Sequence, residues 1–433
     1  MTSRDLATLR GVLVVCVSMK RGSARRHACC RSRRSPPLGV PTTMTHSPYR
    51  VATRLSGFEI VRPAYETSQA GSLEWLSRLH AASARAASTD PASFDGRAYA
   101  AQVSKLLARV GCSPEKIAAR GYEVADISHT RWEDMLVYDV VRRPDGAPAG
   151  TRTEVFMRAA ERAFERLYAT VWTPPSDLIH VTCTGYASPS AAQRLVTRRG
   201  WGETTRVTHA YHMGCYAALP AIRMAAGFLA SASNASSRAD IVHTEICSLH
   251  LHPAEHAPEQ LVVQSLFADG HVRYSVVRGG ESDGKSLTLL SAREVLVPDS
   301  SGAMSWIVSD TGMAMTLARD VPMRIARGVR EFVASLYAEG KLDMRRDLER
   351  TVFAVHPGGP RIIEGIQQAL ELTDAQTAAS REVLFRFGNM SSSTLPHVWT
   401  ALMNDAGVTT GTPIVSLAFG PGLTMCGALM IKE

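Results

Sequence analysis

A cysteine, a histidine and an asparagine stand out in this sequence as residues that could do chemistry together. Cys215 follows a glycine, His356 is followed by Pro-Gly-Gly-Pro at 357–360, and Asn389 again follows a glycine. A thiol is a nucleophile, and an imidazole and an amide beside it can activate the thiol, stabilise an oxyanion, or do both. The set therefore predicts acyl chemistry on a cysteine.

The elements around Cys215 must present its sulfur at a strand-to-helix turn. Apolar residues at 221, 224, 225 and 228 have helical spacing, so a helix is expected to begin close to the cysteine, with Pro220 in its first turn. Gly214 lets an acyl group approach the backbone. A helix N-terminus favours thiolate, so we expect a lowered pKa for Cys215. The alternative is that this cysteine is a small buried hydrophobic residue.

The other elements predict an α/β protein. His356 ends a short apolar run and precedes a tight turn, which is typical of a strand end. Apolar, β-rich runs at 178–185, 241–246 and 414–419 alternate with helical segments such as 191–196. This alternation indicates a mixed or parallel sheet that is buried on both faces.

Six motifs together resemble the type III polyketide synthases, the chalcone-synthase-like branch of the thiolase superfamily. They are Gly-Cys at 214–215, Leu-Phe-Ala-Asp-Gly at 266–270, His-Pro-Gly-Gly-Pro at 356–360, Arg-Glu-Val-Leu at 381–384, Gly-Asn-Met-Ser-Ser at 388–392 and Phe-Gly-Pro-Gly-Leu-Thr at 419–424. The resemblance implies an α/β thiolase fold, with two similar βα halves packed as a five-layered αβαβα core. We expect an N-terminal half at 44–290 with the cysteine and a C-terminal half at 291–433 with the histidine and asparagine.

The resemblance also implies the roles of the three residues. Cys215 would be acylated, while His356 and Asn389 would bind the extender thioester carbonyl, promote its decarboxylation and stabilise the enolate. Acyl thioesters of coenzyme A or of an acyl carrier protein would be the substrates, with no cofactor and no metal. A homodimer is implied as well.

Several pocket residues that the resemblance assigns depart from the plant pattern. The resemblance assigns six residues to the pocket, of which the last four depart from that pattern: Cys183 and Phe267, and then Ser188, His250, Trp306 and Met315. Phe267 matches a gatekeeper phenylalanine, but Met315 stands at the second gatekeeper position and Trp306 replaces a cavity glycine. His250 replaces a threonine, and Ser188 replaces the methionine that crosses into the partner's cavity. These changes predict another acyl specificity, with few condensations and a preference for long aliphatic acyl groups.

The subfamily follows from general similarity around 57–130 and 200–230. There the chain is most similar to bacterial enzymes that stand alone beside modular assembly lines and join two carrier-bound chains into an α-pyrone. An alkylresorcinol-type synthase is the alternative product class. A non-catalytic scaffold that binds carrier proteins is the non-enzyme alternative, and a papain-like protease lacks support because its signature around the cysteine is missing.

The resemblance also implies that basic residues meet the phosphates of coenzyme A, as they do in plant members of the family. Residues 55–125 have helical spacing, and Lys105, Arg109, Lys116 and Arg120 lie there, although a solvated helix face is the ordinary interpretation. Arg361 directly follows the turn after the catalytic histidine, so it could meet a phosphopantetheine phosphate or simply be an exposed helix charge.

Composition excludes other classes of protein. Residues 1–43 hold nine Lys or Arg against one Asp, which accounts for the whole net charge of +8, so the remaining chain is neutral and unlike a nucleic-acid-binding domain. We expect 1–43 to be a disordered or misannotated extension, with Met44 as the true start. Five scattered cysteines in the body form no disulfide framework, which fits a reducing cytoplasm, and no stretch reaches membrane-spanning length. His250, His252 and His256 offer only a weak metal site.

Overall fold

A computed structural model describes residues 52–234, 237–279 and 285–433. The predicted extension at 1–43 and the proposed start at Met44 lie outside the described residues. Residues 47–433 form one compact unit.

Nine strands form the central sheet. In spatial order they are β11 (Val352–Val355), β12 (Pro413–Gly420), β13 (Thr424–Lys432), β8 (Leu287–Leu296), β1 (Thr53–Val61), β7 (Gly270–Arg278), β6 (Arg238–Glu245), β4 (Asp177–Thr182) and β5 (Arg206–Tyr211). β4 pairs with β5 and β6 in parallel, as β11 does with β12, and the other pairs are antiparallel. The predicted mixed sheet is therefore confirmed.

Strand β1 joins the two halves of the sheet. It pairs with β7 along most of its length and with β8 at only three residues, Thr53 to Leu55. Residues 55–61 were expected to be helical, and this expectation is wrong. Thr53 and Leu55 on one face of β1 are buried, while Gly57 and Glu59 are exposed beyond the register shift that begins at Ser56.

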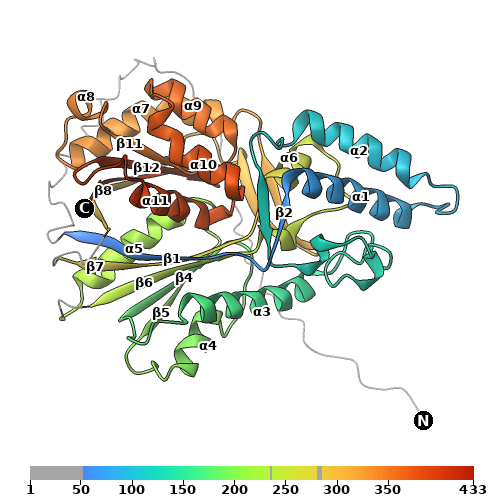
Figure 1. Cartoon of the computed structure of the whole chain (residues 1–433), viewed down its shortest axis with the longest axis horizontal. Helices are drawn as coiled ribbons and strands as arrows, with labels where there is room; N and C mark the ends of the chain where they lie inside the picture. The colour runs from blue at the N-terminus through green and yellow to red at the C-terminus, as the bar shows by residue number, and fades with distance from the viewer. Residues whose placement is uncertain (1–51, 235–236, 280–284) are drawn as a thin grey trace, which may run out of the picture. The chain divides into compact units, whose positions relative to one another are not determined.

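Helices cover the sheet in layers. Their bounds are α3 (Ala149–Leu167), α4 (Ala191–Arg198), α5 (Ala218–Ala230), α7 (Val321–Glu339), α9 (Pro360–Leu370) and α11 (Thr394–Asn404). α3 and α4 pack outside the β4–β6 half, α7 and α9 pack outside the β11–β13 half, and α5 and α11 lie between the halves. Figure 1 shows these five layers from top to bottom. The α/β thiolase-like fold is confirmed.

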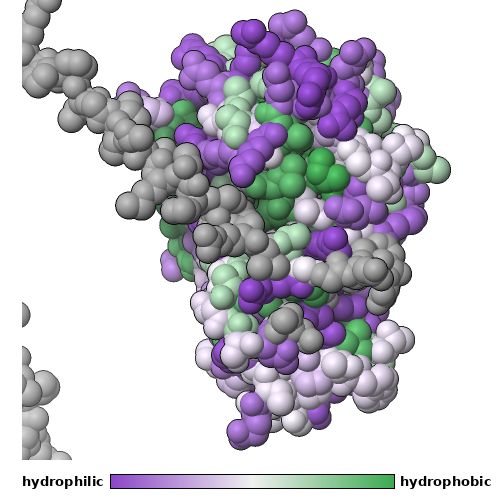
Figure 2. All heavy atoms as spheres, turned by 90° about the vertical axis from the view of Figure 1, so that its left-hand side faces the viewer, coloured by the Kyte–Doolittle hydropathy of each residue, from purple (hydrophilic) through white to green (hydrophobic). Residues whose placement is uncertain are grey.

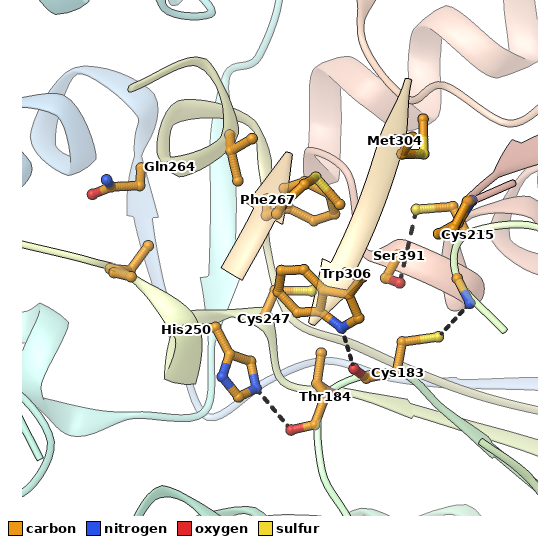
Figure 3. Close-up of a pocket in the computed structure, with 15 residues that line it drawn as sticks. Cys183, Thr184, Cys215, Cys247, His250, Gln264, Phe267, Met304, Trp306 and Ser391 are labelled. Carbon is orange, nitrogen blue, oxygen red and sulfur yellow. Dashed lines mark hydrogen bonds between the residues drawn. The ribbon is translucent and has the colours of Figure 1, made fainter. Parts of the chain in front are cut away.

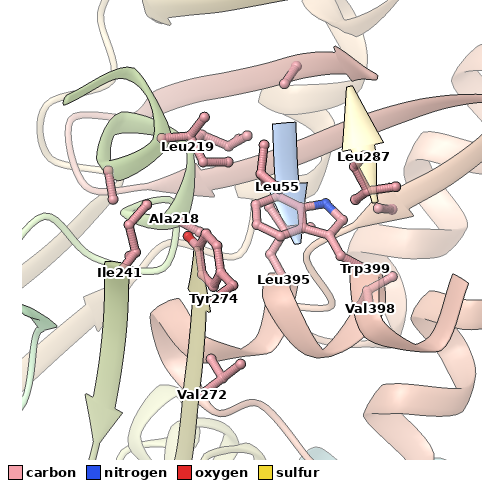
Figure 4. Close-up of a cluster of buried hydrophobic side chains, with 14 of the residues drawn as sticks. Leu55, Ala218, Leu219, Ile241, Val272, Tyr274, Leu287, Leu395, Val398 and Trp399 are labelled. Carbon is pink, nitrogen blue, oxygen red and sulfur yellow. The ribbon is translucent and has the colours of Figure 1, made fainter. Parts of the chain in front are cut away.

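The core between the halves is built around large aromatic side chains. Trp399 of α11 and Tyr274 of β7 are fully buried, with ring centroids 5.8 Å apart and nearly perpendicular. Figure 4 shows them between α5 and α11, beside Leu55 of β1. The Trp399 indole N–H donates to the Ser416 hydroxyl at 2.8 Å, so its polar atom is satisfied in the core. These buried side chains thus pack the two halves of the sheet against the central helices.

A smaller group of elements lies beside these layers, near the pocket described below. It contains α1 (Gln69–Ala87), α2 (Gly96–Val110), α6 (Pro258–Leu266), the pair β2 (Tyr65–Ser68) and β3 (Ala119–Tyr122), and the hairpin β9 (Met304–Ser309) and β10 (Gly312–Leu317). α1 and α2 confirm the helices expected from the spacing at 73–79 and 103–110. The hairpin is a separate two-stranded sheet.

The surface is consistent with the sequence, in which no stretch reaches membrane-spanning length. Figure 2 shows one face on which hydrophilic residues predominate around a limited hydrophobic area. Among the described residues, no helix combines the length and the apolar character that crossing a bilayer would need.

Candidate active site

Cys215 lies in the turn between β5 and α5, as predicted. Pro220 is the third residue of α5, within the first turn. Gly214 has a φ of +86°, and a Cβ there would lie 2.6 Å from Pro421 Cδ, so only glycine fits. The tight turn brings the Cys215 backbone against the loop that follows β12. The Cys215 sulfur lies 3.9 Å from the Ser391 hydroxyl.

The expected low pKa of Cys215 is wrong. The side chain is buried, and burial raises the pKa of the thiol to about 12, while the Ser391 hydroxyl lowers it and the Glu245 carboxylate raises it further. Burial disfavours the charged form of a thiol, and it is the largest cause of the raised pKa here. The nucleophile therefore rests as a neutral thiol.

The backbone of His356 is fixed at the end of β11, while its ring forms no hydrogen bond with the described residues. Its backbone N–H donates to the Leu417 carbonyl at 2.7 Å, which continues the β11–β12 pairing. Both ring nitrogens are buried, and neither is hydrogen bonded to any of the described residues. Burial lowers the pKa of His356 to about 3, so the ring is neutral at pH 7. Two buried, unpaired nitrogens are unusual and indicate a site for a polar ligand.

Asn389 is fixed by its backbone and by its side-chain oxygen. It follows α10 (Ala378–Phe387), its N–H donates to the Leu266 carbonyl at 3.0 Å, and its carbonyl accepts from the Ala268 N–H at 2.8 Å. The Oδ1 atom accepts from the Ser391 N–H at 3.0 Å. This leaves the Nδ2 donors of the amide, for which the described residues provide no hydrogen-bond acceptor. The amide can therefore donate to a substrate oxygen.

Leu266 and Ser391 connect the segments that carry the three residues. The turn at 357–360 packs against the Leu266 side chain, while the Leu266 backbone pairs with Asn389. Ser391, two residues beyond the asparagine, contacts the Cys215 sulfur. The tertiary structure thus brings the histidine turn, the asparagine loop and the nucleophile turn to one place.

A pocket opens onto the cysteine. Six of the sequence-predicted residues line it: Cys183, Cys215, His250, Phe267, Trp306 and Met315. Figure 3 shows Trp306 between Cys183 and His250, with Phe267 on the other side of the pocket. The free space is about 30 Å³, room for about two water molecules.

Trp306 is the most firmly held part of the wall. Its indole N–H donates to the Cys183 carbonyl at 2.6 Å, and its own carbonyl accepts from His212 Nε2 at 2.7 Å. Met315 lies directly opposite Trp306 across the β9–β10 hairpin. The ring of His250 meets the indole edge to face, with centroids 5.6 Å apart. Hydrogen bonds therefore attach the pocket wall to Cys183 and to His212, which lies three residues before the nucleophile.

A buried carboxylate supports the loops beneath the pocket. Glu245 accepts from the Cys183 N–H and the Thr184 hydroxyl, each at 3.0 Å, and from the Ser392 hydroxyl. Burial raises the pKa of Glu245, while these hydrogen bonds lower it. Glu245 thus ties the Cys183 loop to the loop that carries the asparagine.

The remaining predicted residues lie outside the pocket. Ser188 is exposed in the loop before α4, Lys105 and Arg109 are exposed on α2, and Arg361 is exposed in the first turn of α9. Arg120 is buried, so its interpretation as a phosphate-binding residue is wrong.

The guanidinium of Arg120 instead forms hydrogen bonds inside the protein. It donates to the carbonyls of Gln264 and Phe267, each at 2.8 Å, and to the Gln69 side chain at 2.7 Å. A buried charge must be satisfied by such bonds. Arg120 therefore holds the segment that carries Phe267 and pairs with Asn389.

The three histidines considered for a metal have separate partners. His250 contacts Thr184 and Met313, His252 contacts Met313, and His256 contacts Tyr99. The described residues contain no group of three or more metal-ligating side chains with a suitable arrangement.

Sequence reasoning missed Thr184, Leu251, Val263 and Gln264, which line the pocket, and four further residues of the site. The further four are Glu245, Cys247, Met304 and Ser391, of which the last three line the pocket. Ser391 lies inside a motif that was recognised, and Met304 lies two residues before Trp306 on the same strand, so both carried a signal. Glu245 and Cys247 carried none.

The chain is similar to chalcone and stilbene synthases. The family model for the N-terminal domain of chalcone and stilbene synthases matches residues 154–280, and the model for their C-terminal domain matches residues 288–432. Type III polyketide synthase C of Arabidopsis thaliana is 30% identical over 263 residues, which are 58% of this chain and 66% of that protein. Probable polyketide synthase 1 of Dictyostelium discoideum is 30% identical over 259 residues, or 58% of this chain and 8% of that much longer protein.

Solved structures show the same fold. PKS-I from the brown alga Ectocarpus siliculosus has a TM-score of 0.74 and 20% identity, covering 88% of this chain and 99% of that one. The C-terminal type III polyketide synthase domain of Steely1, a type I/III hybrid from Dictyostelium, has a TM-score of 0.72 and 22% identity with the same coverage. The two family models together match more than half of the chain, at residues 154–280 and 288–432, so the chain belongs to the chalcone and stilbene synthase family of type III polyketide synthases.

Proposed function

We propose that this protein is a decarboxylative Claisen condensing enzyme, an acyltransferase that loads an acyl group on Cys215 and extends or joins it. The observation that carries the proposal is a pair of unused polar groups on two loops near the nucleophile turn. Asn389 belongs to the loop whose Ser391 contacts the thiol, and that loop pairs with Leu266, against which the turn after His356 packs. Both ring nitrogens of His356 are buried, and neither has a hydrogen-bond partner among the described residues. The side-chain bonds of Asn389 within the described part of the chain go to its Oδ1 atom, which leaves its Nδ2 hydrogens for a substrate oxygen. Two neutral donors near a nucleophile are suited to a thioester oxygen that gains negative charge.

Loading forms one thioester and breaks another. The Cys215 sulfur attacks the carbonyl of the acyl thioester, and the carrier thiol leaves with the proton of the cysteine thiol. Because the resting thiol is neutral, its proton must move during this step. In this proposal a ring nitrogen of His356, which has no hydrogen-bond partner among the described residues, relays the proton to the leaving thiolate.

Extension begins with loss of carbon dioxide. A malonyl-type thioester would place its carbonyl oxygen toward Asn389 Nδ2 and a protonated nitrogen of His356. The C–C bond to the carboxylate breaks, its electron pair forms the enolate, and both donors stabilise the enolate oxygen. The enolate carbon then attacks the acyl carbonyl on Cys215, and the cysteine thiolate leaves. An apolar pocket favours loss of the carboxylate, so no cofactor or metal enters the scheme.

The finer assignment concerns the product and the partners. We infer that the enzyme makes an α-pyrone by joining carrier-bound chains, with an alkylresorcinol-type product as the alternative. Trp306 in the pocket wall supports few condensations, because it occupies space that a growing chain would need. Acyl carrier protein and coenzyme A thioesters are the candidate donors, and Arg361 beside the histidine turn is the candidate phosphate contact.

Assembly and location belong to the same proposal. We infer a homodimer, with the exposed loop at Ser188 as the candidate contact near the partner's pocket. All five cysteines of the described chain are free, which supports a reducing compartment such as the cytoplasm.

Intact mass spectrometry tests the activity. The wild type incubated with acyl coenzyme A should gain one acyl mass, Cys215→Ala should gain none, and Cys426→Ala should behave like the wild type because that thiol lies outside the pocket. Release of carbon dioxide from malonyl coenzyme A should accompany condensation. A folded wild type that gains no acyl mass from either coenzyme A or carrier thioesters would instead favour the carrier-binding scaffold.

A further inference from the structure

The β9–β10 hairpin forms a wall of the pocket but is not part of the main sheet. Met304, Trp306 and Met315 of this hairpin line the pocket. Within the described part of the chain, its two strands pair with each other and with no other strand. Among the described residues, the backbone bond that joins the hairpin to the rest of the chain is at its tip, from the Ala149 N–H to the Asp310 carbonyl at 2.8 Å.

Hydrogen bonds from histidine side chains attach the hairpin to the rest of the protein, whereas backbone hydrogen bonds attach a strand of the main sheet to its neighbours. His212 Nε2 lies 2.7 Å from the Trp306 carbonyl, and His252 Nε2 lies 2.9 Å from the Met313 carbonyl. Both nitrogens must carry the proton, because a carbonyl only accepts. His250 completes the set, which we name the hairpin histidines (His212, His250 and His252).

His250 has the most constrained role of the three. Its Nε2–H donates to the Thr184 carbonyl at 2.8 Å, and its Nδ1 accepts from the Met313 N–H at 3.2 Å. This pattern requires one neutral tautomer, and burial lowers the pKa of His250 to about 3, which keeps the ring neutral. The ring therefore connects the Cys183–Thr184 loop directly to β10, and its edge-to-face contact with Trp306 fixes the wall residue between them.

The closed wall leaves little room for a substrate. The free space of about 30 Å³ holds about two waters, which is far less than an aliphatic acyl chain needs. The opposite side of the pocket is less able to yield, since the Phe267 backbone is bound by the buried Arg120 and bridged to Asn389. The hairpin, attached mainly by side chains, is the wall that can move.

We propose that the hairpin histidines determine which acyl groups Cys215 accepts, by setting how readily the β9–β10 wall moves away from the nucleophile. The inference rests on the proposed function, since it concerns loading of the same thiol. A short acyl group needs little displacement of the wall. A long aliphatic chain must displace it, so each hydrogen bond to the hairpin acts against long chains.

Two variants loosen the hairpin without removing ring volume. His250→Phe keeps a ring in the pocket wall but loses the bonds to Thr184 and Met313. His252→Phe loses the bond to Met313, and His252 does not line the pocket, so a direct change of pocket volume is avoided. His256→Gln is the matched control, because that histidine contacts Tyr99 and not the hairpin.

Loading of butanoyl and dodecanoyl coenzyme A, without extender, should be followed by intact mass to give kcat/KM for each. We expect the dodecanoyl-to-butanoyl ratio to rise about fivefold or more in both phenylalanine variants and to stay unchanged in the control, since one net hydrogen bond is worth roughly 1 kcal/mol. An unchanged or lower ratio in folded His250→Phe and His252→Phe would overturn the inference.

Two further outcomes are distinguishable. If His250→Phe fails to fold, Gln260→Ala provides a second test, because Gln260 donates to the Met315 carbonyl at 2.6 Å from the partly exposed α6 and does not line the pocket. If the wild type loads neither thioester, the proposed function fails first, and the inference fails with it. A wild type that loads butanoyl with a ratio insensitive to all three variants contradicts the inference alone.

Discussion

The indole N–H of Trp306 donates to the carbonyl of Cys183 at 2.6 Å. The Cys183 sulfur in turn accepts a hydrogen bond at 3.0 Å from the N–H of Gly214, the residue before the nucleophile. A chain of two bonds therefore links the pocket wall to the turn that carries Cys215. We therefore expect a substitution of Trp306 to affect the extension of the acyl group more than the stability of the fold.

Trp306→Gly should yield longer polyketides than the wild type, because removing the indole opens the space into which a growing chain can extend. Product masses after incubation with malonyl coenzyme A measure this. Trp306→Phe, which keeps much of the volume and loses only the bond to Cys183, should give products closer to those of the wild type. An unchanged product spectrum in a stable Trp306→Gly variant would show that this side chain does not limit chain growth.

Asn389→Ala should still be acylated but should decarboxylate malonyl coenzyme A roughly a hundredfold more slowly, because the amide acts on the enolate after loading. Asn389→Asp separates chemistry from structure, since it keeps the oxygen that accepts from Ser391 and loses the donor. Both variants should therefore show the same defect. Normal carbon dioxide release from either would contradict the assigned role, and Asn404→Ala, exposed at the end of α11, is the matched control.

The rate at which iodoacetamide modifies Cys215 should rise about tenfold per pH unit between pH 7 and 10. Burial raises the pKa of the thiol to about 12, and below its pKa the thiolate fraction grows tenfold for each unit of pH. The rate therefore increases with pH and should reach no plateau in this range. A plateau beginning below pH 8 would mean that the thiol is activated in solution; Cys215→Ser gives the background from the other cysteines.

Arg361→Ala should raise KM for carrier-bound or coenzyme A substrates roughly three- to tenfold and leave kcat nearly unchanged, as expected when binding is lost equally in the ground and transition states. The arginine is exposed in the first turn of α9, close to the histidine turn, and forms no ion pair with the described residues. Arg386→Ala, which breaks an exposed pair with Glu382, is the control. Equal KM values in all three proteins would mark Arg361 as an ordinary surface charge.

Arg120→Met should lower the melting temperature by roughly 5–10 °C, because it leaves the buried carbonyls of Gln264 and Phe267 without their donor. Arg109→Met, on the exposed face of α2, should change it by no more than about 2 °C. Differential scanning calorimetry of both variants makes the comparison. Equal melting temperatures would mean that the two carbonyls find other donors when the guanidinium is removed.

The sequence by itself determined the local features of the active site. Helical spacing after Cys215 and the glycine and proline residues around Cys215 and His356 predicted a strand-to-helix turn and a strand end, and both are present. Such features depend on neighbouring residues, so they can be predicted from a single stretch of chain. The six motifs, through their resemblance to a family, predicted the layered fold.

The tertiary structure decided the properties that depend on residues far apart in the chain. The Cys215 thiol was expected to be acidic, but burial beneath loops from both halves raises its pKa. Arg120 was considered as a surface cation, yet it is buried against the Phe267 segment. His250 was predicted only as a pocket residue, and its bonds to Thr184 and Met313 could not be foreseen. Burial and hydrogen-bond partners are set by packing between distant segments, which sequence periodicity does not encode.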